Sequence, residues 1–238
     1  MRWGYDWLLN PATLKTPGAV AAGVDGVAWE NLIVTPVKEG WMKPEEVGGD
    51  AKFDWWRRLR EVECSWVNNR DESERFLYYD GPTTMRCPVT SALEEGRVVV
   101  RGAELAAGEK TFLQGQKITV GLMRDGFLIT VHEGEATARL VSIPLTEKEA
   151  GGKWPVSLEA RNVPGKADEV FLKAIVGRGL SDSEARGMVA SWRKAFFETE
   201  GARLLMFLTA EDYQVFCPLE VLPAPTEMAR VGVIWVEL

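Results

Sequence analysis

Histidine is almost absent from this chain, since His132 is the only one in 238 residues. Hydrolytic zinc sites use two or three histidines with carboxylate or thiolate partners, so a single histidine excludes most of them. It also leaves a serine triad with one possible base, and Ser157, Ser181 and Ser191 all lie outside a Gly-x-Ser-x-Gly turn. We therefore expect His132 to be an exposed or hydrogen-bonded residue near the end of a strand.

Cysteine is scarce as well, and Cys64, Cys87 and Cys217 are far apart in the sequence. An odd number of cysteines without short spacings is neither a disulfide framework nor a zinc-binding pattern. Free, buried thiols are the expectation, because cysteine packs as a small apolar side chain. A disulfide between Cys64 and Cys87 is the alternative if the protein is exported.

Long apolar runs and basic clusters are also missing. No stretch of about 18 apolar residues exists, so we expect a soluble protein without a transmembrane segment. Polar residues, prolines and charges interrupt residues 1–23, which therefore lack a signal-peptide core. The expected location is cytoplasmic, or exported or envelope-associated if the N-terminus is truncated or processed. The net charge of −7 argues against nucleic-acid binding, which requires clustered lysine and arginine.

Phosphate-binding and cation-binding motifs are absent too. Residues 177–179 (Gly-Arg-Gly) lack the third glycine and the preceding strand of a dinucleotide-binding turn. The densest carboxylate groups are Asp71 and Glu72 with Glu74, and Glu211 with Asp212. We interpret both groups as exposed loop charges rather than as cation ligands. The sequence therefore predicts no cofactor and no bound metal.

Short apolar segments separated by turns run through much of the chain. Strands are expected near residues 3–7, 32–35, 61–67, 74–80, 85–91, 97–101, 136–144, 204–208, 220–222 and 231–236, with a turn at 94–96. Asp125 and Gly126 lie between the apolar segments 117–124 and 127–133, which predicts a hairpin with a type I′ turn at these two residues. The ten tryptophans are expected to pack between these elements.

Two helices are predicted in the last third of the chain, and shorter helical turns at residues 53–59 and 213–216. Residues 168–176 carry apolar side chains at helical spacing before a glycine that ends the helix. Residues 181–200 begin with Ser181 and Glu184, the pattern of a capping box, and end before Gly201. The predicted buried face of this helix consists of Ala185, Met188, Trp192, Ala195 and Phe196.

Together these patterns predict an α+β fold class. Its mostly antiparallel β structure would form a sandwich-like or curled sheet, with a C-terminal helical hairpin packed on it. Residues 1–25 are expected as an N-terminal tail or edge strand and residues 26–150 as a β-rich domain. Residues 151–238 are expected as a helix-containing α+β part that is continuous with the β-rich core.

Three segments are distinctive enough to compare with known protein families. They are residues 74–79 (ERFLYY), 183–192 (SEARGMVASW) and 218–231 (PLEVLPAPTEMARV). In this order they resemble a family of uncharacterised bacterial proteins that are often predicted to be exported. The similarity covers roughly residues 27–238 and is strongest over residues 180–231. The family has no established activity, so the resemblance implies no catalytic residues. Its typical members are longer, with an upstream β-rich region and an export signal, so we expect this chain either not to be exported or to be a shortened member.

The leading functional hypothesis is a non-catalytic binding or structural module, either at the cell envelope or elsewhere, with a protein or carbohydrate partner. The alternative is a carboxylate-dependent, glycosidase-like hydrolase without a metal, which requires only two acids at a suitable separation. The candidate acids are Glu74, Asp80, Glu184 and Glu227. The sequence does not indicate which two of them would lie together.

Overall fold

The computed structural model describes residues 19–23, 26–36, 54–68, 73–77, 85–108, 110–111 and 124–238. The predicted strand at residues 3–7, the segment 117–123 and the acids Asp71, Glu72 and Asp80 lie outside these residues. The chain divides into two compact units, one with residues 1–83 and 182–191 and the other with residues 84–181 and 192–238. The predicted domain boundaries near residues 25 and 150 stay predictions.

Two small antiparallel sheets belong to the first unit. β1 (Ala19–Gly23) pairs with β2 (Gly26–Trp29), and β4 (Trp66–Asn68) pairs with both β3 (Ile33–Thr35) and β5 (Ser73–Glu74). The buried Asn68 ties the second sheet together, because its Nδ2 donates to the Ile33 oxygen at 3.0 Å and its Oδ1 accepts from the Ser73 hydroxyl at 2.6 Å. α1 (Asp54–Arg60) lies at the position of the predicted helical turn.

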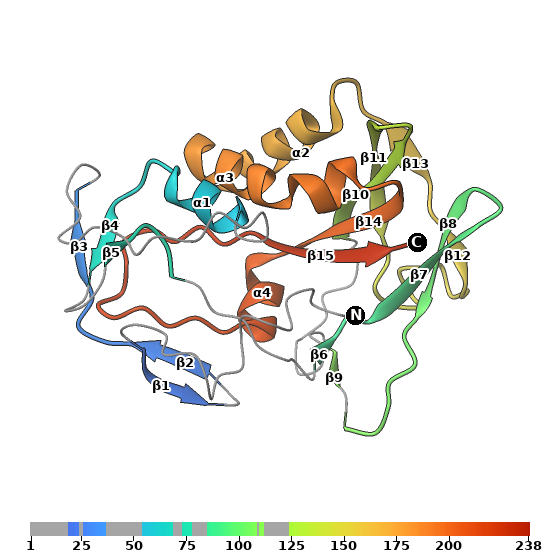
Figure 1. Ribbon diagram of the computed structural model, residues 1–238. Coiled ribbons are helices and arrows are strands. Elements are labelled where there is room, and N and C mark those ends of the chain that lie inside the picture. Colours follow the sequence, from blue (N-terminus) through green and yellow to red (C-terminus); the bar gives the residue numbers. More distant parts are fainter. Residues whose placement is uncertain are drawn as a thin grey trace. The chain divides into compact units, whose positions relative to one another are not determined.

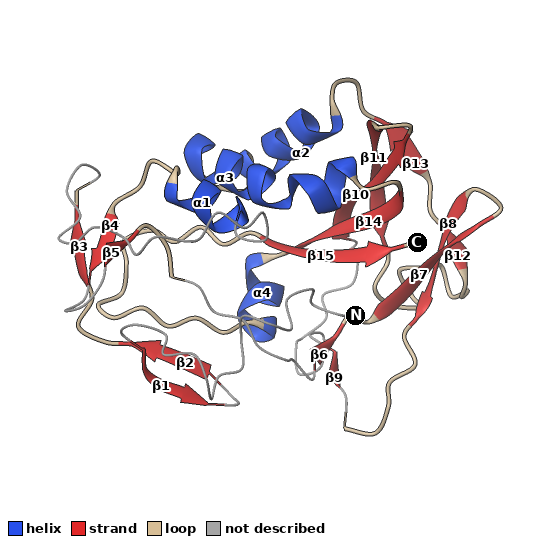
Figure 2. Ribbon diagram, in the orientation of Figure 1, coloured by secondary structure: helices blue, strands red, loops and turns tan. Residues whose placement is uncertain are grey.

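A five-stranded antiparallel sheet is the centre of the second unit (Figure 1). Its spatial order is β13 (Ala160–Asn162), β11 (Glu135–Ile143), β10 (Arg124–His132), β14 (Gly201–Leu208) and β15 (Gly232–Glu237). On one face, Phe127 and Phe207 pack against Phe171 of α2 (Ala167–Val176), with ring centroids 6.3 and 5.6 Å apart. α2 therefore covers this face, as Figure 2 shows.

The opposite face of the five-stranded sheet packs on a second, three-stranded sheet. This sheet consists of β12 (Val156–Ser157), β8 (Arg97–Gly102) and β7 (Val89–Glu94). Leu128 and Ile143 share a buried core with Val98 and Val100 of β8. The turn between β7 and β8 lies at residues 95–96, which confirms the turn predicted there. A parallel pair, β6 (Met85–Arg86) and β9 (Lys110–Thr111), completes the described strands of this unit.

The predicted C-terminal helical hairpin is wrong. The structure is α+β, but its strands form several separate sheets. Its helices are spread along the chain as α1, α2, α3 (Asp182–Arg193) and α4 (Ala210–Phe216). Each helix has its own neighbours, with α2 packed on β11 and α4 beside β14. Helical periodicity reveals an apolar face but not the element that this face covers, which is why the hairpin was mispredicted.

The predicted helix at residues 181–200 is present as α3 followed by the π-helical segment η2 (Lys194–Glu198). Its buried side chains are Ala185, Val189, Phe196 and Phe197, whereas Met188, Trp192 and Ala195 are half-buried. Trp192 stacks on Phe196 with ring centroids 5.3 Å apart. The buried face is therefore turned from the predicted one, and the π-helical turn changes the side-chain register after residue 193.

β10 runs without interruption through Asp125 and Gly126, so the type I′ turn predicted at these residues is wrong. The turn between β10 and β11 lies at Glu133 and Gly134, where φ is 51° and 79°. A Cβ on Gly126 would lie 2.5 Å from the carbonyl oxygen of Leu205 in β14, so this glycine permits close strand approach. Residues 220–222, predicted as a strand, are exposed and have no regular secondary structure.

Candidate binding site

The four carboxylates of the hydrolase hypothesis have different surroundings. Glu74 of β5 is held by Arg60, whose Nε donates to its two carboxylate oxygens at 3.0 and 3.1 Å, and its side chain is 16% exposed. The interpretation of Glu74 as an exposed loop charge is therefore wrong. Glu184 is exposed on α3, and Glu227 is exposed in the segment between α4 and β15. Asp80 lies outside the described residues, and the hydrolase hypothesis stays a prediction.

The single histidine is exposed, and the three cysteines form no disulfide. The His132 side chain is 78% exposed, and its Nδ1 lies 3.0 Å from Oε1 of Glu200, which confirms the predicted exposed, hydrogen-bonded histidine. Cys64, Cys87 and Cys217 are free. Burial raises the pKa of the Cys87 thiol to about 11, so this thiol is protonated at neutral pH.

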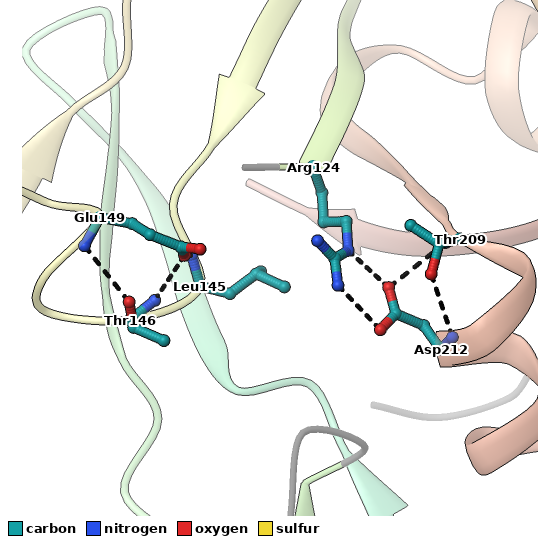
Figure 3. A network of polar contacts seen from close by, with 6 residues as sticks. All are labelled: Arg124, Leu145, Thr146, Glu149, Thr209 and Asp212. Carbon is teal, nitrogen blue, oxygen red and sulfur yellow. Dashed lines mark hydrogen bonds and ion pairs between the residues drawn. The ribbon is translucent and has the colours of Figure 1, made fainter. Parts of the chain in front are cut away.

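A buried ion pair joins Arg124 of β10 to Asp212 of α4 (Figure 3). Nε and Nη2 of Arg124 donate to the two carboxylate oxygens at 2.5 and 2.8 Å, and the side chains are 4% and 1% exposed. Asp212 also forms a capping box with Thr209, whose Oγ1 accepts from the Asp212 backbone N at 3.1 Å. The interpretation of Asp212 as an exposed loop charge is therefore wrong. Because the carboxylate is fully occupied by protein donors, the pair anchors α4 to β10.

Two other polar clusters stabilise backbone turns. Oε2 of Glu149 accepts from the backbone N of Leu145 and Thr146 at 2.7 and 3.1 Å and closes the turn after β11 (Figure 3). The guanidinium of the buried Arg203 donates to the carbonyl oxygens of Phe196, Thr199 and Glu200 at 2.9, 2.6 and 3.2 Å. Carbonyls at a helix end lack helical partners, so this cation stabilises the end of η2.

An open depression lies at the outer edge of the five-stranded sheet, where β13 ends beside β11. Its volume is about 410 Å³, and its lining consists of Thr130, residues 136–139, Asn162, Val163 and Gly165. Arg139 of β11 and Asn162 of β13 are directly paired, so their side chains share one face of the sheet. Thr137 lies two residues before Arg139 and is paired with Thr130, which places both threonines on this face as well.

The sequence after β13 explains why the edge of β11 is open at this point. Val163 donates its backbone N–H to the Ala138 oxygen at 3.3 Å, the last bond between the two segments. Pro164 has no N–H to continue the ladder, and Gly165 has a φ of 116°, which residues with a side chain rarely adopt. The chain therefore leaves the sheet and enters α2.

The depression has a positive character. Among its lining residues, Arg139 is the one charged side chain. It is half-buried, and its guanidinium makes no ion pair or hydrogen bond with the part of the chain that the structure describes. The exposed Arg161 of β13 is paired with Leu140, so its side chain lies on the other face of the sheet, and the exposed Glu135 lies at the hairpin end. Arginine, asparagine and threonine donors converging in one depression suit a ligand with a negatively charged group.

No protein-family model, curated protein or solved structure matches the chain. The resemblance to the bacterial family therefore stays a prediction. Within the described ranges, no group of three or more histidine, cysteine, aspartate or glutamate residues is placed to hold a metal ion. No helix in these ranges is long and apolar enough to cross a membrane. Sequence reasoning missed the depression, although residues 164–165 (Pro-Gly) directly after a short strand are a signal for an interrupted sheet edge.

Proposed function

We propose that the chain is a non-catalytic binding module that holds a negatively charged group of a partner in the depression at the edge of β11. The observation that carries this proposal is Arg139, a half-buried cation in an open depression without a protein partner among the described residues. The partner is a protein or a carbohydrate.

Three other partly or fully buried arginines of the described chain support this assignment by contrast. Arg60 binds a carboxylate, Arg124 binds a carboxylate, and Arg203 binds three backbone carbonyls. These guanidinium groups stabilise the fold. Arg139 has no such role, yet it lies where β11 is paired with β10 and β13 on its two sides, which is a rigid support for a binding group. Its planar donors match the geometry of a carboxylate or a phosphate.

The cellular location of the protein determines which negatively charged ligands it could meet. A cytoplasmic protein would meet acidic segments of other proteins at this edge. An exported or envelope-associated protein would also meet acidic polysaccharides. Both ligands present carboxylates, which are the groups that Arg139 and Asn162 can bind.

A titration with two chemically different probes tests the proposed function. One probe is a linear oligosaccharide of galacturonic acid, and the other is the blocked peptide acetyl-Thr-Val-Glu-Val-Thr-amide. Amide chemical shifts of the full chain, labelled with ¹⁵N, are followed at about 0.1 M salt. We expect at least one probe to shift the resonances of residues 136–139 and 162–165, and Arg139→Ala to weaken that binding about tenfold or more, the loss of a charge-assisted bond.

Arg97→Ala is the matched control, because it removes an exposed arginine from β8 in the same unit. It should bind like the unchanged protein, and both variants should keep the melting temperature. If neither probe binds, or if Arg97→Ala weakens binding as much as Arg139→Ala, the depression is not a specific anion site and the proposed function is wrong.

A further inference from the structure

We propose that the occupant of the depression is an extended segment of a partner protein, which adds as a short strand to the free edge of β11 and places an acidic side chain on Arg139. This inference rests on the proposed function and adds the class of ligand and its mode of binding.

The register leaves one stretch of β11 without a neighbour on its outer side. β13 pairs with residues 139–141 of β11, and the bond from Val163 to Ala138 extends this ladder by one residue. No other strand of the described chain pairs with β11 on that side. The edge therefore ends abruptly beside residues 135–137, where the depression lies.

The backbone groups of Ala136 point to this free edge. In antiparallel strands, alternate residues bond to the neighbour on one side and the residues between them bond to the other side. Glu135 faces His132 across the two-residue turn, so residues 135, 137 and 139 bond towards β10. The bond that Ala138 accepts from Val163 agrees with this alternation, because it lies on the outer side. Both the N–H and the carbonyl of Ala136 are thus available to a further strand.

An added strand would bring a side chain within reach of Arg139. A peptide residue opposite Ala136 would direct its side chain to the α2 face, and its neighbour opposite Thr137 would direct its side chain to the face of Arg139. The peptide residue opposite Thr137 is the diagonal neighbour of Arg139. Their backbones would be about 7–8 Å apart, a distance that the side chains of an arginine and a glutamate span together. The acidic residue of the ligand therefore lies opposite Thr137.

Charge and shape favour a peptide over a sugar as the occupant. Arg139 is the one charged side chain of the lining, so an acidic side chain is favoured beside it, whereas the exposed Glu135 disfavours one at the hairpin end. None of the residues that line the depression is aromatic, so it has no ring on which a sugar could stack. Free main-chain groups beside a specificity pocket are the elements by which sheets bind extended peptides.

The decisive experiment places N-methyl groups on the peptide acetyl-Thr-Val-Glu-Val-Thr-amide, one position at a time, and measures binding to the full chain by ¹⁵N chemical shifts. Peptide N–H groups that point to β11 alternate with those that point away. Residues 138 and 139 are already paired with Val163 and Asn162, so the Ala136 carbonyl is the one acceptor that the free edge of β11 offers to the peptide. We therefore expect methylation of the valine opposite Ala136 to weaken binding about tenfold or more, and methylation at the other positions to leave binding like that of the parent. Hydrogen exchange of the Ala136 amide should slow in the complex.

Replacing glutamate by glutamine in the peptide should weaken binding to the unchanged protein about tenfold, and should have no further effect on binding to Arg139→Ala. If methylation at every position has the same effect, the peptide does not add as a strand and the inference is overturned. If the galacturonate oligosaccharide binds through Arg139 and the peptide does not, the inference fails while the proposed function stands. If neither probe binds, both fail.

Discussion

Asp212→Ala removes one partner of the buried ion pair with Arg124, and we expect it to destabilise the protein strongly. The guanidinium would remain almost inaccessible to water, since its side chain is 4% exposed in the intact pair. Removing one partner of such a pair costs about 3–5 kcal/mol. Loss of the capping box with Thr209 adds about 1 kcal/mol. Because a protein of this kind is stable by about 5–15 kcal/mol, much of its stability would be lost.

The double variant Arg124→Met with Asp212→Leu distinguishes the net contribution of the ion pair to stability from the cost of leaving one buried charge unpaired. Two apolar side chains of similar size need no compensation for lost hydration, so the double variant should be much more stable than Asp212→Ala. The expected coupling free energy between the two positions is several kcal/mol. Thr209→Ala, which removes only the cap, should cost about 1 kcal/mol.

Urea unfolding followed by tryptophan fluorescence and far-ultraviolet circular dichroism measures all four variants. Arg101→Ala serves as the control, because Arg101 and its partner Glu94 are each 48% exposed and such a pair contributes about 0–1 kcal/mol. If Asp212→Ala costs no more than Arg101→Ala, the carboxylate is not buried against Arg124 and the reasoning is refuted. If the double variant is as unstable as Asp212→Ala, the loss arises from packing or capping rather than from an isolated charge.

Gly126→Ala should destabilise the protein by about 1–3 kcal/mol in urea, because its Cβ would lie 2.5 Å from the Leu205 carbonyl oxygen. Glu133→Asn should stabilise it by about 1 kcal/mol, because φ is 51° at this turn position and asparagine tolerates that conformation better. Burial raises the pKa of Cys87 to about 11, so its stabilising contribution is fully present below the unfolded-state pKa, about 9, and is lost as the pH rises towards 11. Between pH 8 and pH 10, the unchanged protein should therefore lose about 1 kcal/mol more stability than Cys87→Ala.

Gly126→Ala has a control in the same unit, and Glu133→Asn has a parallel variant there. Gly102→Ala should be close to neutral, because its Cβ would lie 3.7 Å from Nε1 of Trp154, an ordinary contact. Glu95→Asn should stabilise the protein as Glu133→Asn does, because φ is 49° at Glu95 in the turn between β7 and β8. Equal costs for Gly126→Ala and Gly102→Ala, or parallel pH profiles with and without Cys87, would contradict the corresponding argument.

The sequence predicts those elements whose signals are local. The helix at residues 168–176 is confirmed as α2, because its apolar side chains recur at helical spacing before a glycine. The turn at residues 94–96 is confirmed for a similar reason. Gly126 shows where local signals fail, since Asp-Gly between apolar segments is typical of a turn, whereas here the glycine faces another strand. Asp212 shows the same limit, because its partner Arg124 lies 88 positions away in the sequence.

The depression is harder to predict, because it depends on a neighbour that is missing. Nothing around Arg139 in the sequence distinguishes it from any exposed arginine of a strand, and its pairing with Asn162 is a matter of sheet register. Pro164 and Gly165 indicate that a strand ends, but they do not indicate which strand loses its partner. The site follows from the sheet register, because the register places the end of β13 beside Ala138 and leaves Ala136 at an open edge. Natural proteins protect such edges with charges or short strands, and here a positive charge stands at the edge instead of a covering strand. If the proposed mode of binding is correct, this charge disfavours edge-to-edge association with basic segments and favours an acidic one.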